Sequence, residues 1–245
     1  MAIVVVGGHT RNIGKTSVVA GLIAALPERR WTAIKITQFG HGVCSANGEP
    51  CDCETADHMV AVSEERERGS GTDSSRYLAA GAERSFWVRT RVGELSEAMP
   101  RVRRLMEEAA GDVIVESNSV LRFLLPDVSL SVLDPKVRDF KASALRYLDR
   151  VDALIVPVGA VFEEGWGGVS RRVIERTRRF EFVAPAYCGG DLVEFVGERL
   201  GAVVGRQELS DAERRGGRTA GLSAAQGEKL PCFGRDGKFS CGERG

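Results

Sequence analysis

Short apolar runs alternate along the chain with segments whose large apolar residues recur at helical spacing. Strands are predicted over the apolar, mostly β-branched runs at residues 2–6, 32–37, 85–89, 112–116, 127–133, 153–158 and 181–184. Helices are predicted over residues 18–26, 55–68, 73–82, 94–110, 140–149, 168–179 and 191–200, with Pro100 kinking or splitting the fourth. This alternation predicts an α/β fold, a mostly parallel sheet with helices on both faces.

The pattern also predicts how the chain is divided. One domain is expected over residues 1–204, because the alternation of strands and helices covers that range. Within it, residues 39–58 are rich in glycine and cysteine and are expected to form an insert. Residues 205–245 lack periodicity and are rich in glycine, arginine and polar residues, so a largely disordered tail is expected there.

Composition and charge narrow the possible partners. The chain has 245 residues, 43% of them hydrophobic, which suffices for a full core. Lysine and arginine number 34, as do aspartate and glutamate, so no global charge indicates a nucleic acid or a membrane surface. No apolar run approaches the roughly 20 residues that cross a bilayer, and no signal-peptide pattern opens the chain. A cytoplasmic protein that binds neither nucleic acid nor membrane is therefore expected.

The segment between the first strand and the first helix carries the most specific chemistry. It runs from Gly8 to Ser17 and ends in Gly14-Lys15-Thr16, the context of a phosphate-binding loop. Backbone N–H groups at the helix start would hold phosphate oxygens, Lys15 would place a charge between the terminal phosphates, and Thr16 would ligate Mg²⁺. We expect a fold of the P-loop NTPase type that binds a nucleoside triphosphate. The residues predicted to contact it are Gly8, Asn12, Ile13, Gly14, Lys15, Thr16 and Ser17.

This loop differs from the usual pattern, which would have glycine where His9 stands. The nearest glycine, Gly8, leaves five residues rather than four before Gly14. In this spacing the loop resembles that of dethiobiotin synthetase and related amide-forming enzymes.

Two further candidates end strands that should lie beside the first one. Glu116 closes an apolar strand and can reach a Mg²⁺ ion held by Thr16, directly or through water, although it can also be an ordinary polar residue at a strand end. Lys35 ends the second strand and either faces the triphosphate or extends to solvent. Because ligands of such sheets bind beyond the carboxyl ends of the strands, Lys15, Lys35 and Glu116 form the predicted catalytic set.

An ordered set of motifs resembles the molybdopterin-guanine dinucleotide biosynthesis protein B (MobB) family. After the phosphate loop come Ile34-Lys35, then Asp73-Ser74-x-Arg76 leading to Ala80-Gly81-Ala82, and then the strand ending in Glu116. The resemblance implies that Glu116 supports the metal and that Asp73 and Arg76 belong to a switch region beside the nucleotide. Read without the family, Asp73 is a helix cap and Arg76 a solvated charge.

The resemblance also implies a function, and three departures qualify it. It implies GTP binding, weak hydrolysis, a homodimer, and an accessory role with molybdopterin-handling proteins in molybdenum cofactor biosynthesis. First, the phosphate loop is one residue longer than that of the family. Second, Glu116 is followed by Ser117-Asn118-Ser119, where the family usually has glycine and an aromatic residue. Third, the insert contains cysteines where histidines are expected. The sequence contains no Asn-Lys-x-Asp segment of the kind that selects guanine, so both ATP and GTP are candidate nucleotides.

The insert brings three thiols together within ten residues. Cys44, Cys51 and Cys53 are candidate ligands for Zn²⁺ or an iron–sulfur cluster, with a fourth ligand from His41, His58, Cys188 or a second subunit. Their spacing is not a standard one, so reduced cysteines in a loop are the alternative. Two other functions therefore stand beside the MobB-like one: an ATP-dependent amide- or ring-forming enzyme of the dethiobiotin synthetase type, and a nucleotide-gated metal-handling protein.

Overall fold

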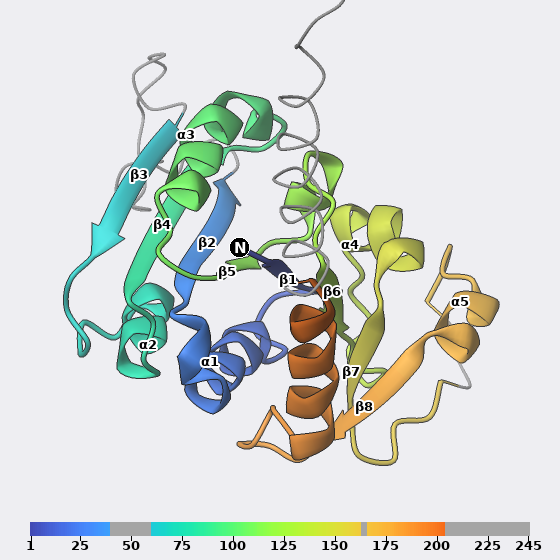
Figure 1. The fold of residues 1–245 in the computed structure, drawn as a ribbon. Coiled ribbons are helices and arrows are strands. Elements are labelled where there is room, and N and C mark those ends of the chain that lie inside the picture. Colours follow the sequence, from blue (N-terminus) through green and yellow to red (C-terminus); the bar gives the residue numbers. More distant parts are fainter. Residues whose placement is uncertain (40–59, 163–165, 204–245) are drawn as a thin grey trace, which may run out of the picture. The chain divides into compact units, whose positions relative to one another are not determined.

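The computed structural model describes residues 1–39, 60–162 and 166–203, and an eight-stranded sheet organises them (Figure 1). The strand order is β3-β4-β2-β5-β1-β6-β7-β8, and every pair is parallel except the edge pair β3 and β4. The strands are β1 (Ile3–Gly8), β2 (Thr32–Phe39), β3 (Val60–Glu65), β4 (Arg84–Arg91), β5 (Val113–Glu116), β6 (Val128–Val132), β7 (Ala153–Pro157) and β8 (Arg178–Phe182). The predicted α/β class with a mostly parallel sheet is confirmed.

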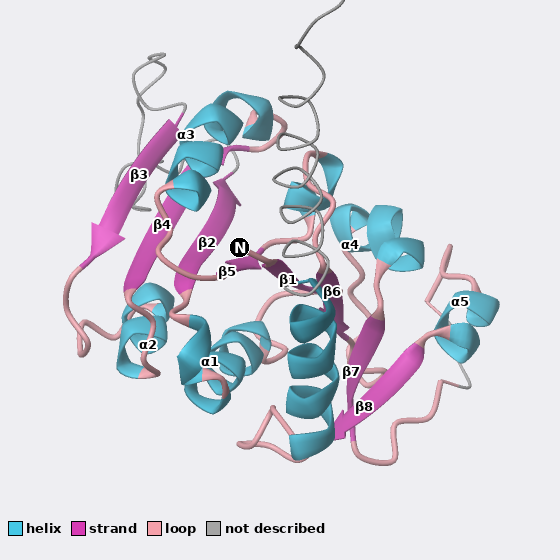
Figure 2. Ribbon diagram, in the orientation of Figure 1, coloured by secondary structure: helices cyan, strands magenta, loops and turns pink. Residues whose placement is uncertain are grey.

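Helices cover both faces of this sheet (Figure 2). They are α1 (Lys15–Ala25), α2 (Asp73–Ala79), α3 (Leu95–Glu107), α4 (Ala142–Tyr147), α5 (Arg171–Arg176) and a helix over residues 190–203. Helices α1, α2 and 190–203 share one apolar cluster with Val4 and Val6, whereas α3 shares another with Val5. Neighbouring residues of β1 thus face opposite layers, as the period of two in a strand requires.

The structure differs from the predicted elements in three places. Residues 60–65 form the edge strand β3 rather than part of a helix, because their half-buried residues pair with β4. Helix α5 ends at Arg176, and the following residues enter β8, where Phe180 and Phe182 are buried and alternate with exposed residues. Helix α3 runs through Pro100 without splitting. In the first two cases tertiary pairing outweighs local helical composition.

Some predictions fall on residues that the structure does not describe. These are the insert, apart from Phe39, which ends β2, and the tail over 205–245. Among the described helices, none is long and apolar enough to span a membrane.

Carboxylates fix the strands at the amino-terminal edge of the sheet. Three aspartates directly precede a strand, and each accepts a hydrogen bond from a backbone N–H of a neighbouring segment. Asp112 accepts from Ala2 at 2.7 Å, Asp127 from Ile3 at 2.8 Å, and Asp152 from Ser129 at 2.8 Å. These bonds satisfy N–H groups that the sheet leaves unpaired there. They also set the alignment of the central strands, and therefore of their carboxyl ends, where Val6 lies beside Glu116.

We predict that Asp112→Ala lowers the free energy of unfolding by about 1–3 kcal/mol, because the buried N–H of Ala2 loses its acceptor. The carboxylate also lies 3.6 Å from the Arg29 guanidinium. Urea unfolding of the full chain measures the effect, with the exposed Glu107→Ala as the control. Equal stability of the two variants would contradict this account of the strand edge.

Candidate functional site

The loop between β1 and α1 has the backbone of a phosphate-binding loop. Gly14 begins α1 with φ 98°, a left-handed conformation that favours glycine, and a Cβ there would come within 2.0 Å of the Tyr187 ring. Within the described residues, no side chain caps the first turn of α1. Its first backbone N–H groups therefore have no side-chain acceptor, which is the arrangement that favours an anion at a helix start.

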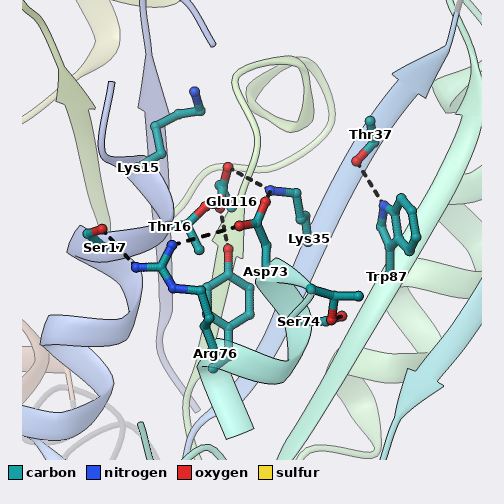
Figure 3. A network of polar contacts seen from close by, with 12 residues as sticks. Lys15, Thr16, Ser17, Lys35, Thr37, Asp73, Ser74, Arg76, Trp87 and Glu116 are labelled. Atoms are coloured by element: carbon teal, nitrogen blue, oxygen red, sulfur yellow. Dashed lines mark hydrogen bonds and ion pairs between the residues drawn. The ribbon is translucent and has the colours of Figure 1, made fainter. Parts of the chain in front are cut away.

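Lys15 lies over this loop in an environment that disfavours its charge. Its Nζ donates to the Thr10 carbonyl oxygen at 2.6 Å, and Figure 3 shows the side chain directed away from Glu116. Burial, with smaller contributions from Lys141 and Lys35, outweighs the attraction of Glu116 and lowers the pKa of Lys15 to about 8. An anion bound beside Lys15 would supply the missing countercharge.

Glu116 is the centre of the polar network in Figure 3. The hydroxyl of Thr16 donates to its Oε2 at 2.8 Å, and Lys35 Nζ donates to its Oε1 at 3.2 Å. The sheet register places Lys35 directly beside Glu116 and Val6 on its other side. The two strand-end residues singled out in the sequence thus meet beside the phosphate loop, and Lys35 turns inward instead of extending to solvent.

A third donor to Glu116 was missed by the sequence reasoning. The Tyr77 hydroxyl donates to Oε2 of Glu116, and the tyrosine is fully buried. Burial and the neighbouring carboxylate raise the pKa of Tyr77 well above its ordinary value, so the hydroxyl stays protonated and donates. The available signal was helical spacing, since Tyr77 follows Asp73 by four residues and shares its helix face.

Helix α2 presents two further predicted residues to the loop. Asp73 forms an ion pair with Lys35, and Arg76 donates to the Ser17 hydroxyl at 3.0 Å. The helix is capped by Thr72, whose side chain accepts from the Ser75 N–H at 3.1 Å, so Asp73 is not the cap. Arg76 thus reaches the start of α1, and Asp73 reaches Lys35 at the end of β2, rather than only solvent.

The start of α2 is held by the last residue of β3. Glu65 accepts from the hydroxyls of Thr72 at 2.7 Å and Ser70 at 3.0 Å. Burial alone would raise the pKa of Glu65, but these hydrogen bonds outweigh burial and lower that pKa to about 2. This anchor was not predicted, because residues 55–68 were predicted as helix.

Asn118 fixes the exit of β1 into the loop. Its side chain accepts from the Gly8 N–H and donates to the Gly8 carbonyl oxygen, both at 2.8 Å. A Cβ on Gly7 would lie 2.1 Å from the Asn118 oxygen, so residue 7 must be glycine for this side chain to approach. The amide thus continues the pairing of β1 beyond the end of β5.

His9, in place of the usual glycine, fixes the other side of the loop. Its ring is fully buried, with centroids 5.3 Å from Phe140 and 5.0 Å from Trp166. Its carbonyl oxygen accepts from the Lys141 N–H at 2.8 Å. We call residues 134–141 the strap; His9 holds the strap against the phosphate loop, and burial lowers the pKa of its ring.

A cavity of about 770 Å³ opens at this carboxyl edge of the sheet. Predicted residues that line it are Asn12, Gly14, Lys15, Thr16, Ser17, Lys35, Asp73, Arg76 and Glu116. Two predicted residues lie behind the loop instead. Gly8 ends β1 and is bound by Asn118, and the Ile13 side chain belongs to the apolar core.

The candidate cysteine site cannot be followed in the described residues. Cys44, Cys51, Cys53, His41 and His58 lie outside them. Cys188 is half-buried against Gly21 of α1, and burial raises the pKa of its thiol to about 11, which keeps it protonated. In the part of the chain that is described, no three histidine, cysteine, aspartate or glutamate residues form a metal-binding group.

Comparison with known proteins adds little beyond the fold. No family model and no curated protein matches the chain. One similar solved structure is HypB from Helicobacter pylori in complex with nickel, 13% identical over 80% of this chain and 86% of that one, with a TM-score of 0.41. Another is LpxK from Aquifex aeolicus in complex with ATP, 17% identical over 76% of this chain and 52% of that one, with a TM-score of 0.38. Neither likeness is close enough to carry an argument about ligand or activity.

The sheet and the loop together decide the fold class. A parallel strand leads through a left-handed glycine into a helix whose first residues are Lys15 and Thr16, with Glu116 ending the adjacent strand. The fold is of the P-loop NTPase type.

We predict that Lys15→Met is more stable than the natural chain near pH 7 and that the difference narrows as the pH rises. Unfolded Lys15 keeps its proton up to about pH 10.5, whereas the folded chain releases it near pH 8, so raising the pH between these values favours the folded natural chain. The difference in the free energy of unfolding between the two proteins should decrease by about 3 kcal/mol at most. Urea unfolding of both proteins from pH 7 to 10 measures it; a difference independent of pH would refute the buried charge.

Proposed function

We propose that this chain is a Mg²⁺-dependent nucleoside triphosphate-binding protein that acts on the terminal phosphate. The observation that carries the proposal is the junction at Glu116, which joins Thr16 of the phosphate loop to Lys35 of the adjacent strand at 2.8 and 3.2 Å. Lys15, Lys35 and Glu116 line one cavity beside a helix start that no side chain caps. This is the arrangement that positions and neutralises a transferring phosphoryl group.

The triphosphate would take its contacts from the loop and the first turn of α1. The backbone N–H groups around Gly14 would hold the phosphate oxygens, aided by the dipole of the eleven-residue helix. Lys15 would exchange its bond to the Thr10 carbonyl oxygen for a phosphate oxygen, a stronger, charge-assisted partner. Lys35 would contact the terminal phosphate from the other side.

Mg²⁺ fits the oxygen donors gathered here. The Thr16 hydroxyl and the Glu116 carboxylate lie within hydrogen-bond distance of each other, and the Asp73 carboxylate shares Lys35 with Glu116. Hydroxyl and carboxylate oxygens are the ligands that this hard cation prefers. When bound, the ion would neutralise charge on the terminal phosphates.

For the biological role we propose an accessory function similar to that of MobB in molybdenum cofactor biosynthesis. The ordered motifs support it, because Lys35 forms ion pairs with both Asp73 and Glu116, which lie far from it in the sequence. In this proposal the chain hydrolyses GTP or ATP weakly, forms a homodimer and works with molybdopterin-handling proteins.

A second candidate is an ATP-dependent enzyme of the dethiobiotin synthetase type. The extent of the cavity favours it, since the lining continues past the phosphate loop to Gln38, Val92 and Ser119 and leaves room for an acceptor. A nucleotide-gated metal-handling role depends on the cysteine insert, which lies outside the described residues.

Calorimetric titration of the full chain with GTP and with ATP, each with Mg²⁺, tests the proposal and separates the two candidates. A preference for GTP supports the MobB-like role, and a preference for ATP supports the enzyme with an acceptor. Binding of neither nucleotide would overturn the proposed function.

We predict that Lys15→Ala weakens Mg²⁺-nucleotide binding by about 30- to 100-fold, the value of one or two charge-assisted hydrogen bonds. The fold should persist, because Lys15 is the first residue of α1, its side chain is not part of the apolar core, and its charge is unfavourable before nucleotide binds. The same titration measures the loss, with circular dichroism as the test of folding. Lys136→Ala is the matched control, since this exposed lysine lies outside the cavity lining. Unchanged affinity in Lys15→Ala would contradict the assignment of the loop.

We predict that Glu116→Gln abolishes most of the difference between nucleotide affinities measured with Mg²⁺ and with EDTA. The amide keeps the size of the carboxylate and can still accept from Thr16, but it lacks the charge that would hold the cation. A Mg²⁺ dependence equal to that of the natural chain would remove Glu116 from the metal site.

A further inference from the structure

The strap carries a second cationic group into the cavity. The Lys141 N–H donates to the carbonyl oxygen of His9 at 2.8 Å, and the strap is held further by the bond from the Thr10 hydroxyl to Asp139. Phe140, the neighbour of Lys141, packs against the buried ring of His9. Lys141 therefore has a fixed position relative to the phosphate loop, and its half-buried side chain lines the cavity.

Lys141 and Arg11 both line this cavity. Neither side chain forms a hydrogen bond or ion pair of its own with any described residue. Burial and the neighbouring charge of Arg11 lower the pKa of Lys141, and the carboxylates of Asp139 and Glu116 offset this only in part. Two cations that line one cavity and form no ion pair attract an anion to it.

The nucleotide accounts for only part of the positive charge in the cavity. Five cationic side chains line it against two carboxylates. Lys35 and Arg76 lie beside those carboxylates, and Lys15 serves the triphosphate. A triphosphate bound with Mg²⁺ has lost part of its own charge to the metal, so Arg11 and Lys141 are left for another anion.

We propose that Arg11 and Lys141 form a subsite for a second, small ligand carrying an oxyanion, a carboxylate or a phosphate group, beside the terminal phosphate of the nucleotide. The hydroxyls of Ser117, Ser119 and Ser143 also line the cavity and can donate to such a group. The subsite rests on the proposed function, because the nucleotide defines the remaining part of the cavity. His9, which replaces the usual loop glycine, is the positioning residue that docks the strap.

The test uses the full chain saturated with Mg²⁺ and a β,γ-imido nucleoside triphosphate analogue, so that the position of the terminal phosphate is filled. Inorganic phosphate is titrated into this complex in one calorimetric arm and succinate in another, to distinguish the two sources of the oxyanion. The variants are Lys141→Met and Arg11→Gln, with Lys136→Met on the exposed part of the same strap as the matched control.

We expect one equivalent of at least one of the two anions to bind. Lys141→Met and Arg11→Gln should each weaken the binding of that anion at least tenfold, while the affinity for the nucleotide analogue changes less than threefold. Lys136→Met should change neither the affinity for the anion nor the affinity for the analogue. If neither anion binds to the saturated natural chain, the subsite is refuted while nucleotide binding stands. If Lys141→Met weakens binding of the nucleotide analogue as much as binding of the anion, Lys141 contacts the nucleotide itself and the proposal fails. Failure of the analogue to bind the natural chain would instead refute the proposed function.

Discussion

The carboxylate of Glu116 is the interaction on which the arrangement of the candidate site depends. It ends the central strand β5 and accepts hydrogen bonds from Thr16 on α1, Lys35 on β2 and Tyr77 on α2. Three elements far apart in the sequence are thereby fixed to one buried group. A buried carboxylate is costly unless donors surround it, so the packing of these elements and the charge of the site are coupled. Because the strand register sets the position of Glu116, the sheet itself determines the geometry of the site.

The phosphate loop is held from two sides by features that a standard loop does not require. On one side the Asn118 amide binds both backbone groups of Gly8, with Gly7 leaving room for it. On the other side His9 fills an aromatic pocket and binds the strap through its carbonyl oxygen. The additional loop residue thus has a physical role, since it turns the start of the loop into an anchor for a neighbouring segment. The segment it anchors delivers Lys141 to the cavity.

Much of this could be predicted from the sequence because it depends on local patterns. Lys35 and Glu116 were found from the rule that parallel strands end at one edge, and both lie in the cavity. Tyr77 was not predicted, although its helical spacing from Asp73 was a signal for it. Asn118 and the anchoring role of His9 were not predicted, because each depends on contacts across many residues that no spacing reveals. Residues 60–65 were predicted as part of a helix because residues 55–68 have a helical composition, yet pairing with β4 decided their conformation. The cap of α2 was misassigned by one residue for a similar reason, since Asp73 is drawn to Lys35 and leaves Thr72 to cap.

We propose that the half-buried ammonium of Lys15 pairs with the phosphates of a bound nucleotide. Calorimetry of nucleotide binding in buffers of different ionisation enthalpy measures the protons taken up with the ligand. With a pKa of about 8 before binding, Lys15 should cause proton uptake that is small near pH 7 and approaches one proton near pH 9, because the bound phosphates raise that pKa. The uptake should persist in Lys141→Met. Proton uptake that is the same at both pH values would contradict the account.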